Sequence, residues 1–145
     1  GPSVWRACAC WHASVMDMMA ATHADSVEPL VRAGLVDLVG MTHLIAPGVS
    51  LVSTPGHTPG HVSVRLESVG QSAVITGDCI HHPIQIAFPR LGTTVDVQPD
   101  VAVQTRERLL TMTAADASLL IGSHFSAPSA VRVCRDGDGF RIEKE

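Results

Sequence analysis

Three residues that can bind a divalent metal ion lie next to predicted strands: His57, Asp78 and His124. His57 stands in the loop 54–60, which reads Thr-Pro-Gly-His-Thr-Pro-Gly and whose prolines and glycines fix the path of the backbone. Asp78 and His124 each follow an apolar run that predicts a buried strand. Because loops at the carboxyl ends of strands in an α/β sheet converge, we expect these side chains to meet at one edge. Imidazole and carboxylate groups are ligands that zinc, manganese and iron accept, which predicts a metal site.

A further histidine, His61, lies four residues after His57. On a helix this spacing is typical of the paired zinc ligands of a protease. The intervening Thr-Pro-Gly opposes a helix, and no glutamate directly follows His57. We therefore expect His61 to be a structural residue at the start of the next strand.

The four cysteines match no paired zinc knuckle and are too few for a disulfide scaffold, so we interpret them as reduced thiols. Cys8 and Cys10, with His12, offer only three ligands near a chain end, which argues against a metal clip. Cys79 is expected to be a small packing residue rather than a nucleophile, because the adjacent carboxylate of Asp78 opposes the thiolate.

The composition is that of one soluble globular domain, with 145 residues, 46% of them hydrophobic, and a net charge of -4. The 10 basic residues form no stripe for phosphates and only 3% of residues are aromatic, which excludes a nucleic-acid partner. No apolar run approaches the roughly 18 residues that span a bilayer, so we expect no membrane partner and a cytoplasmic location. Residues 1–3 resemble the remnant of a purification tag, which leaves 4–145 as the domain.

Apolar periodicity and turn residues predict a mixed α/β layered domain. A short helix is expected to begin with Ser26 as its N-cap, to hold Pro29 in its first turn and to end at Gly34. A longer helix is expected from about Pro99 to Ala115. The predicted strands are 43–46, 49–53, 62–67, 73–76, 118–121, 130–134 and 140–143.

Two kinds of strand pattern predict which strand faces are buried. Val62, Val64 and Leu66 alternate with polar residues, which predicts a strand with one dry and one wet face. The runs 73–76 and 118–121 are almost continuously apolar, which predicts strands that are buried on both faces.

Three segments in order carry a resemblance to a known family: 54–61, Thr76-Gly77-Asp78 and Gly122-Ser123-His124. They resemble the third, fourth and fifth motifs of the metallo-β-lactamase-fold hydrolases, in the lactonase and organophosphate-hydrolase branch. The spacings of 21 and 46 residues between the three candidate ligands fit that branch. The resemblance implies that His57 binds one metal ion, that Asp78 bridges two and has the catalytic role, and that His124 binds the second. It also implies zinc or another divalent transition metal as the cofactor.

The segment after Asp78 resembles the same branch and contains His81 and His82. These two histidines are candidates for lining a substrate pocket. Adjacent side chains point apart on an extended backbone, so at most one of them is expected to do so.

The family's principal metal motif, His-x-His-x-Asp-His, occurs nowhere in this sequence. The resemblance therefore covers only the C-terminal half of the family's fold, and it implies half of an αββα sandwich, a mixed β-sheet with helices on one face. With one histidine per metal and one shared aspartate, the chain keeps fewer ligands than a catalytic zinc site normally has.

Two functions follow as expectations. The first is a metal-dependent hydrolase of an ester, lactone or phosphoester, represented by its C-terminal half and inactive alone. The alternative is a truncated, non-catalytic domain that associates with itself. A lone half would expose an apolar sheet face on the order of 400 Å², comparable to the largest patches that monomers tolerate, so we expect a homodimer.

Overall fold

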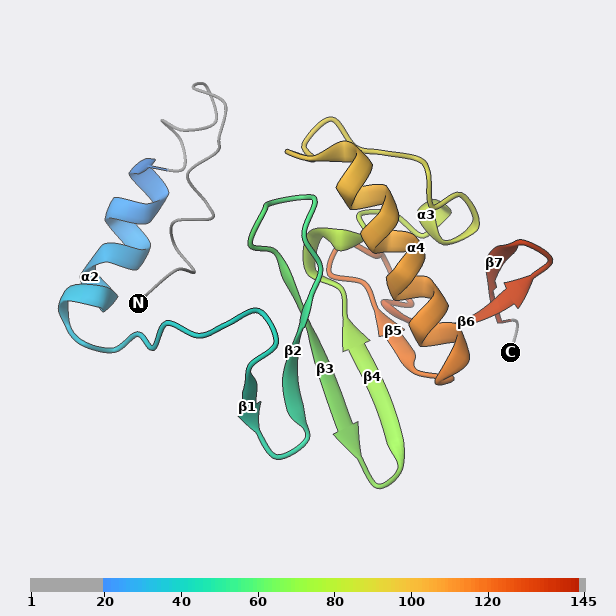
Figure 1. Ribbon diagram of the computed structural model, residues 1–145, viewed down its shortest axis with the longest axis horizontal. Helices are drawn as coiled ribbons and strands as arrows, with labels where there is room; N and C mark the ends of the chain where they lie inside the picture. Colours follow the sequence, from blue (N-terminus) through green and yellow to red (C-terminus); the bar gives the residue numbers. More distant parts are fainter. Residues whose placement is uncertain (1–19, 144–145) are drawn as a thin grey trace. The chain divides into compact units, whose positions relative to one another are not determined.

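The computed structural model describes residues 20–143, which form two units, one ending at Gly40 and one from Met41 onward (Figure 1). The proposed tag remnant and the cysteine pair near the N-terminus lie outside the described residues. No helix in the described range has the length and apolar character needed to cross a bilayer.

In the first unit, residues 20–32 are helical throughout and include η2 (His23–Val27) and α2 (Glu28–Arg32). The prediction that Ser26 caps a helix is wrong, because the chain is already helical before it and Ser26 lies inside the π-helical turn. The predicted end of the helix is confirmed. Gly34 adopts a φ of +68°, and the amides of Gly34 and Leu35 donate to the carbonyls of Val31 and Leu30.

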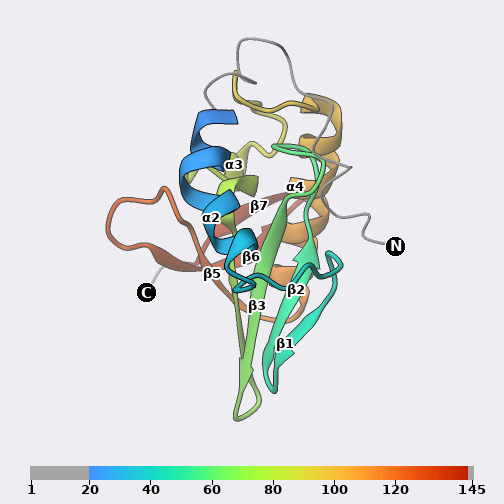
Figure 2. The same ribbon diagram turned by 90° about the vertical axis from the view of Figure 1, so that its left-hand side faces the viewer.

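The second unit contains one seven-stranded sheet, which Figure 2 shows from the side. Its strands lie in chain order: β1 (Leu44–Ala46), β2 (Val49–Ser53), β3 (Val62–Ser68), β4 (Gln71–Ile75), β5 (Leu119–Ile121), β6 (Ala130–Asp136) and β7 (Gly139–Ile142). All neighbours are antiparallel except β4 and β5, which are parallel. The crossover between these two contains η3 (Gly77–Cys79), α3 (Ile84–Ala87) and α4 (Pro99–Ala115). The mixed α/β class and the long helix are therefore confirmed.

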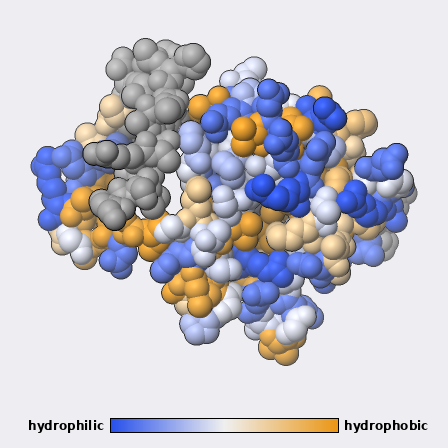
Figure 3. All heavy atoms as spheres, in the orientation of Figure 1, coloured by the Kyte–Doolittle hydropathy of each residue, from blue (hydrophilic) through white to orange (hydrophobic). Residues whose placement is uncertain are grey.

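One face of the sheet is covered by α4. Val74 of β4 and Leu120 of β5 are fully buried there, in one core with Leu109 and Leu110 of the helix. This helix lies over the sheet in Figure 1, and in the space-filling view of Figure 3 hydrophilic residues lie among the hydrophobic ones on that side of the molecule.

The opposite face of the sheet is apolar but only half-buried. The strand register places these nine aliphatic residues on it: Val49, Leu51, Val62, Val64, Leu66, Ala73, Ile75, Leu119 and Ile121. The prediction that β4 and β5 are buried on both faces is thus wrong, because each is fully buried only on the side of α4.

The prediction of a dry valine face on β3 is wrong as well. The residue of β3 that is buried is Ser63, which is 1% exposed, whereas Val62 and Val64 are half-buried. Ser63 tolerates burial because its hydroxyl donates to the carbonyl of Thr76 at 3.0 Å and bonds to the hydroxyl of Thr54 at 3.1 Å. The side of the sheet under the helix is therefore polar near the loop that carries His57.

The loop 54–60 is pressed against the start of α4. The amide of Gln98 donates to the carbonyl of Gly56, and that of Val97 donates to the carbonyl of His57. Gly56 has a φ of +137°, and a Cβ atom built on it would lie 2.3 Å from the Cα of Ala102. Only glycine fits this position, since a side chain would force the loop away from the helix.

We predict that Gly56→Ala lowers the free energy of unfolding by about 3 kcal/mol, because it combines an unfavourable φ with a backbone clash. Urea denaturation followed by circular dichroism measures this. Gly92→Ala is the control, since nothing lies within 4 Å of a Cβ there, and it should change stability by less than about 0.5 kcal/mol. Equal effects of the two substitutions would contradict the close packing of the loop on α4.

Candidate metal centre

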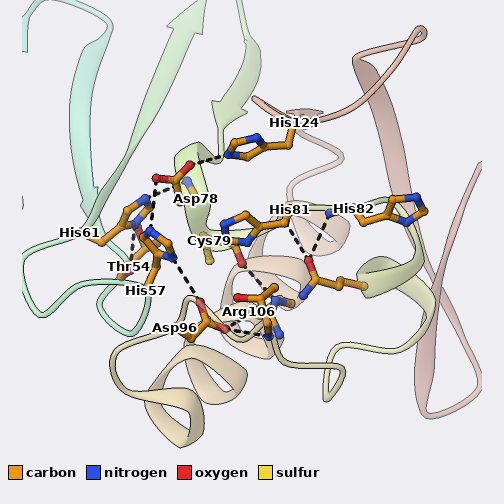
Figure 4. Close-up of polar contacts among 12 residues, drawn as sticks. Thr54, His57, His61, Asp78, Cys79, His81, His82, Asp96, Arg106 and His124 are labelled. Carbon is orange, nitrogen blue, oxygen red and sulfur yellow. Dashed lines mark hydrogen bonds and ion pairs between the residues drawn. The ribbon is translucent and has the colours of Figure 1, made fainter. Parts of the chain in front are cut away.

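The parallel pairing of β4 and β5 brings two of the predicted ligands together. Ile75 is in register with Ile121, so the carboxyl ends of both strands lie at the same edge of the sheet. Asp78 follows in η3 and His124 in the turn after β5. His57 reaches the same edge from the loop between β2 and β3, so all three side chains point toward one another in Figure 4.

Asp78 lies between the two histidines, with one carboxylate oxygen toward each. Nε2 of His124 donates to Oδ1 of Asp78 at 2.6 Å, and Nε2 of His57 lies 3.5 Å from Oδ2. The side chains of Asp78 and His124 are 43% and 47% exposed, whereas that of His57 is 18% exposed. Burial alone would raise the pKa of Asp78, but the hydrogen bond from His124 and the nearby histidines hold that pKa below its usual value.

His57 is oriented by Asp96, a residue that sequence analysis did not identify. Nδ1 of His57 lies 3.3 Å from Oδ1 of Asp96, whose side chain is completely buried. A proton on Nδ1 leaves the lone pair of Nε2 directed toward the carboxylate of Asp78. No local pattern in the sequence identified Asp96, because its place depends on the burial of Arg106 in α4, which only the structure shows, and a buried cation needs an acidic partner.

Arg106 is the second residue that sequence analysis did not identify, and it connects the loops behind the site. It is fully buried, and its guanidinium donates to the carbonyls of Cys79, Pro89 and Leu91. Its Nη2 lies 3.5 Å from Oδ2 of Asp96. The position of η3 and the orientation of His57 therefore depend on the same side chain.

His61 is structural, as expected, and does not present a free nitrogen. Nδ1 of His61 donates to the carbonyl of Thr54 at 3.0 Å, and Nε2 accepts the amide of Asp78 at 2.9 Å. This pattern requires a neutral ring, and burial lowers the pKa of His61. Its role is to hold the backbone of Asp78 against the start of β3.

The two candidate pocket histidines point in different directions. The ring of His81 lies 5.0 Å from the rings of both His57 and His124, whereas His82 is exposed and points away from the cluster (Figure 4). Burial, followed by repulsion from the neighbouring imidazoles of His57 and His124, lowers the pKa of His81. Of the two residues, His81 alone faces the candidate ligands.

Cys79 is a packing residue, as expected, but for a different physical reason. It is 5% exposed and belongs to the core, and burial raises the pKa of its thiol to about 11. Desolvation, rather than the neighbouring carboxylate, therefore keeps it protonated. Cys79 and Cys134 are both free thiols.

The donor set fits a divalent transition metal. Two ligands of a tetrahedral zinc ion lie about 3.3 Å apart, which is close to the 3.5 Å between Nε2 of His57 and Oδ2 of Asp78. Those two atoms are both acceptors when Nδ1 of His57 carries the proton, an arrangement that a cation would stabilise. Two overlapping groups offer ligand atoms within 4.8 Å of one another: Asp78, His81 and His124, and His57, His81 and Asp96.

Comparison with known proteins identifies the family of the chain. The sequence profile of the Metallo-beta-lactamase superfamily matches residues 3–124. The chain belongs to the metallo-β-lactamase superfamily. None of the curated proteins matches it.

Several solved structures of hydrolases resemble this metallo-β-lactamase chain. The hydrolase AbOPH of the beta lactamase superfamily has a TM-score of 0.72 and 25% identity, over 87% of this chain and 46% of that chain. AidC, a dizinc quorum-quenching lactonase, has a TM-score of 0.70 and 20% identity, over 85% and 46%. A probable metal-dependent hydrolase from Staphylococcus aureus has a TM-score of 0.66 and 22% identity, over 78% and 42%. The chain thus spans less than half the length of each.

The lowered pKa of His61 predicts that stability depends on pH. As the pH falls, His61 is protonated near pH 6.5 in the unfolded chain but only at a lower pH in the folded chain. The stability that the neutral ring of His61 contributes is therefore complete above pH 6.5 and is lost as the pH falls from there through the folded pKa. We expect His61→Gln, which cannot titrate, to lose less stability than the wild type between pH 7.5 and pH 5. Urea midpoints at both values measure this. The control His82→Gln, at an exposed position, should keep the wild-type difference.

Proposed function

We propose that this chain forms the metal-binding part of a hydrolase that acts on an ester, lactone or phosphoester, and that it is inactive alone. The observation that carries the proposal is the convergence of His57, Asp78 and His124 at one sheet edge, with each carboxylate oxygen of Asp78 facing a different histidine. Membership of the superfamily and the likeness to hydrolases such as a dizinc lactonase support it.

Asp78 would hold a metal together with His57 at one carboxylate oxygen or with His124 at the other, and zinc is the best match to nitrogen and carboxylate ligands. When bound, such a metal polarises the scissile carbonyl or phosphoryl group and lowers the pKa of water to near neutral. Asp96 fixes the ring of His57, and His61 holds the backbone of Asp78. The chain thus supplies oriented side chains at a sheet edge where Asp78 and His124 remain partly exposed.

Metal binding and hydrolysis test this proposal separately. We expect the purified chain to bind zinc or cobalt, and Asp78→Ala to lose the metal because it removes both oxygens that face the histidines. Elemental analysis after gel filtration measures the metal content. Asp138→Ala, in the exposed turn between β6 and β7, is the matched control and should bind as the wild type does.

Chromogenic esters, lactones and phosphotriesters should be hydrolysed only at the background rate, because two protein ligands per metal cannot fix a two-metal centre. Metal-dependent turnover that Asp78→Ala abolishes would contradict the proposed inactivity. A chain that binds no metal would contradict the proposed site.

The half-buried apolar face favours a second candidate function, a self-associating domain. Nine aliphatic residues of β2 to β5 share this face, and none of them is fully buried. We propose that a second copy of the chain covers it in a homodimer. A twofold contact between identical faces closes on itself and does not polymerise.

Light scattering at micromolar concentration should then report about twice the 15.3 kDa chain mass. Val64→Lys places a charge in the middle of the apolar face and should shift the chain to monomer. Val69→Lys is the control, since Val69 is 99% exposed in the turn between β3 and β4 and should not change the mass. A wild-type monomer would contradict the homodimer.

A further inference from the structure

His81 is the histidine of the site that the three motifs do not assign as a metal ligand, and its ring lies among those that they do assign. Its ring is stacked on the ring of His124, with 5.0 Å between the two ring centroids and an angle of 19° between the ring planes. Nδ1 of His81 is buried and has no hydrogen-bond partner among the described residues. A buried nitrogen without a partner is costly, so such an atom calls for a ligand.

The backbone around His81 is held rigidly by a buried glutamine. Oε1 of Gln85 accepts the amides of both His81 and His82, at 2.8 and 3.2 Å. Gln85 is 3% exposed, and its Nε2 donates to the carbonyl of Leu91 at 2.8 Å. This double contact fixes the peptide that turns His81 into the cluster and His82 away from it (Figure 4). Because the backbone of His81 is already fixed, little conformational entropy of this side chain is lost when it binds a ligand.

We infer that His81 is a metal ligand, which together with Asp78 and His124 holds one divalent ion. One ligand atom from each of these residues lies within 4.8 Å of the other two. A catalytic zinc site usually has three protein ligands and a fourth coordination position that is open to water or substrate. The inference rests on the proposed function in placing a metal at this edge, and it adds a ligand that makes up for part of the missing upstream motif.

The other possible group, His57, His81 and Asp96, is less suited to a cation. Asp96 is buried, accepts the amide of Thr93 at 3.3 Å and lies 3.5 Å from the guanidinium of Arg106. A metal ion there would face a buried positive charge that already neutralises the carboxylate. Among the described residues, the charged contacts of Asp78 are with His57 and His124 and not with a buried arginine, and its Oδ1 lies 2.6 Å from Nε2 of His124. The ion therefore belongs on the His124 side of Asp78.

Cobalt titration of the chain tests this inference through the visible absorption of the bound ion. The wild type should bind one tight Co²⁺ per chain, with the bands of a low-coordinate site. His81→Ala should weaken binding by about 100-fold or more, since even residues behind the ligands contribute about 10–100-fold. His82→Ala removes the same side chain at the adjacent, exposed position and should bind as the wild type does. His124→Ala should lose the ion as His81→Ala does.

Replacement of His81 by cysteine keeps the test decisive even if the alanine variant folds poorly. In His81→Cys a thiolate stands in for the imidazole, so Co²⁺ should regain tight binding and show a sulfur-to-cobalt charge-transfer band in the near ultraviolet that the wild type lacks. This band arises only when residue 81 contacts the metal directly.

Wild-type affinity in His81→Ala, or cobalt bound to His81→Cys without the charge-transfer band, would overturn the inference. If the ion then still disappears in Asp78→Ala, the proposed function stands without His81. No binding by the wild type would overturn both. Loss of the ion in His81→Ala but not in His124→Ala would also overturn the inference, because it would place the metal in the group of His57 and Asp96.

Discussion

The burial of Arg106 in α4 is the constraint on which the site depends. Its guanidinium is fully buried and contacts η3, the segment 89–91 and Asp96. Removal of one partner of a buried ion pair costs about 3–5 kcal/mol, because the remaining charge stays desolvated. Since Asp96 orients His57 and η3 carries Asp78, one side chain of the core fixes groups from two loops that are distant in sequence.

Much of this arrangement could be predicted from the sequence. Pro47-Gly48, the 99–115 helix and the strands before Asp78 and His124 carry local signals, and the structure confirms them. Those strand ends were enough to bring the candidate ligands to one edge, because parallel strands end on the same side of a sheet. Asp96 was missed since it lies in an irregular segment whose path is set by Arg106, and no local pattern encodes such a contact.

The errors about strand faces share one physical cause. Continuous apolar runs in β4 and β5 indicate that both sides are suited to burial, but only contacts elsewhere decide whether both sides are covered. Here α4 covers one side, and the described part of the second unit offers no equivalent on the other. Ser63 shows the opposite error. The alternation of β3 predicts that the side of Ser63 faces water, but two hydrogen bonds allow this polar residue to lie on the buried side.

The single parallel pair of strands also sets the order in which the chain can fold. Strands β1 to β4 pair with sequence neighbours through two short turns and the loop 54–61, whereas β4 and β5 meet only after the whole crossover has closed. Closure of a long loop costs entropy before any contact compensates for it, so this pairing is intrinsically slow. Asp78 and His124, 46 residues apart, become neighbours in that step. A nascent chain therefore forms the meander that carries His57 and Asp78 before His124 arrives beside them, so the cluster of side chains is completed only in a late step of folding.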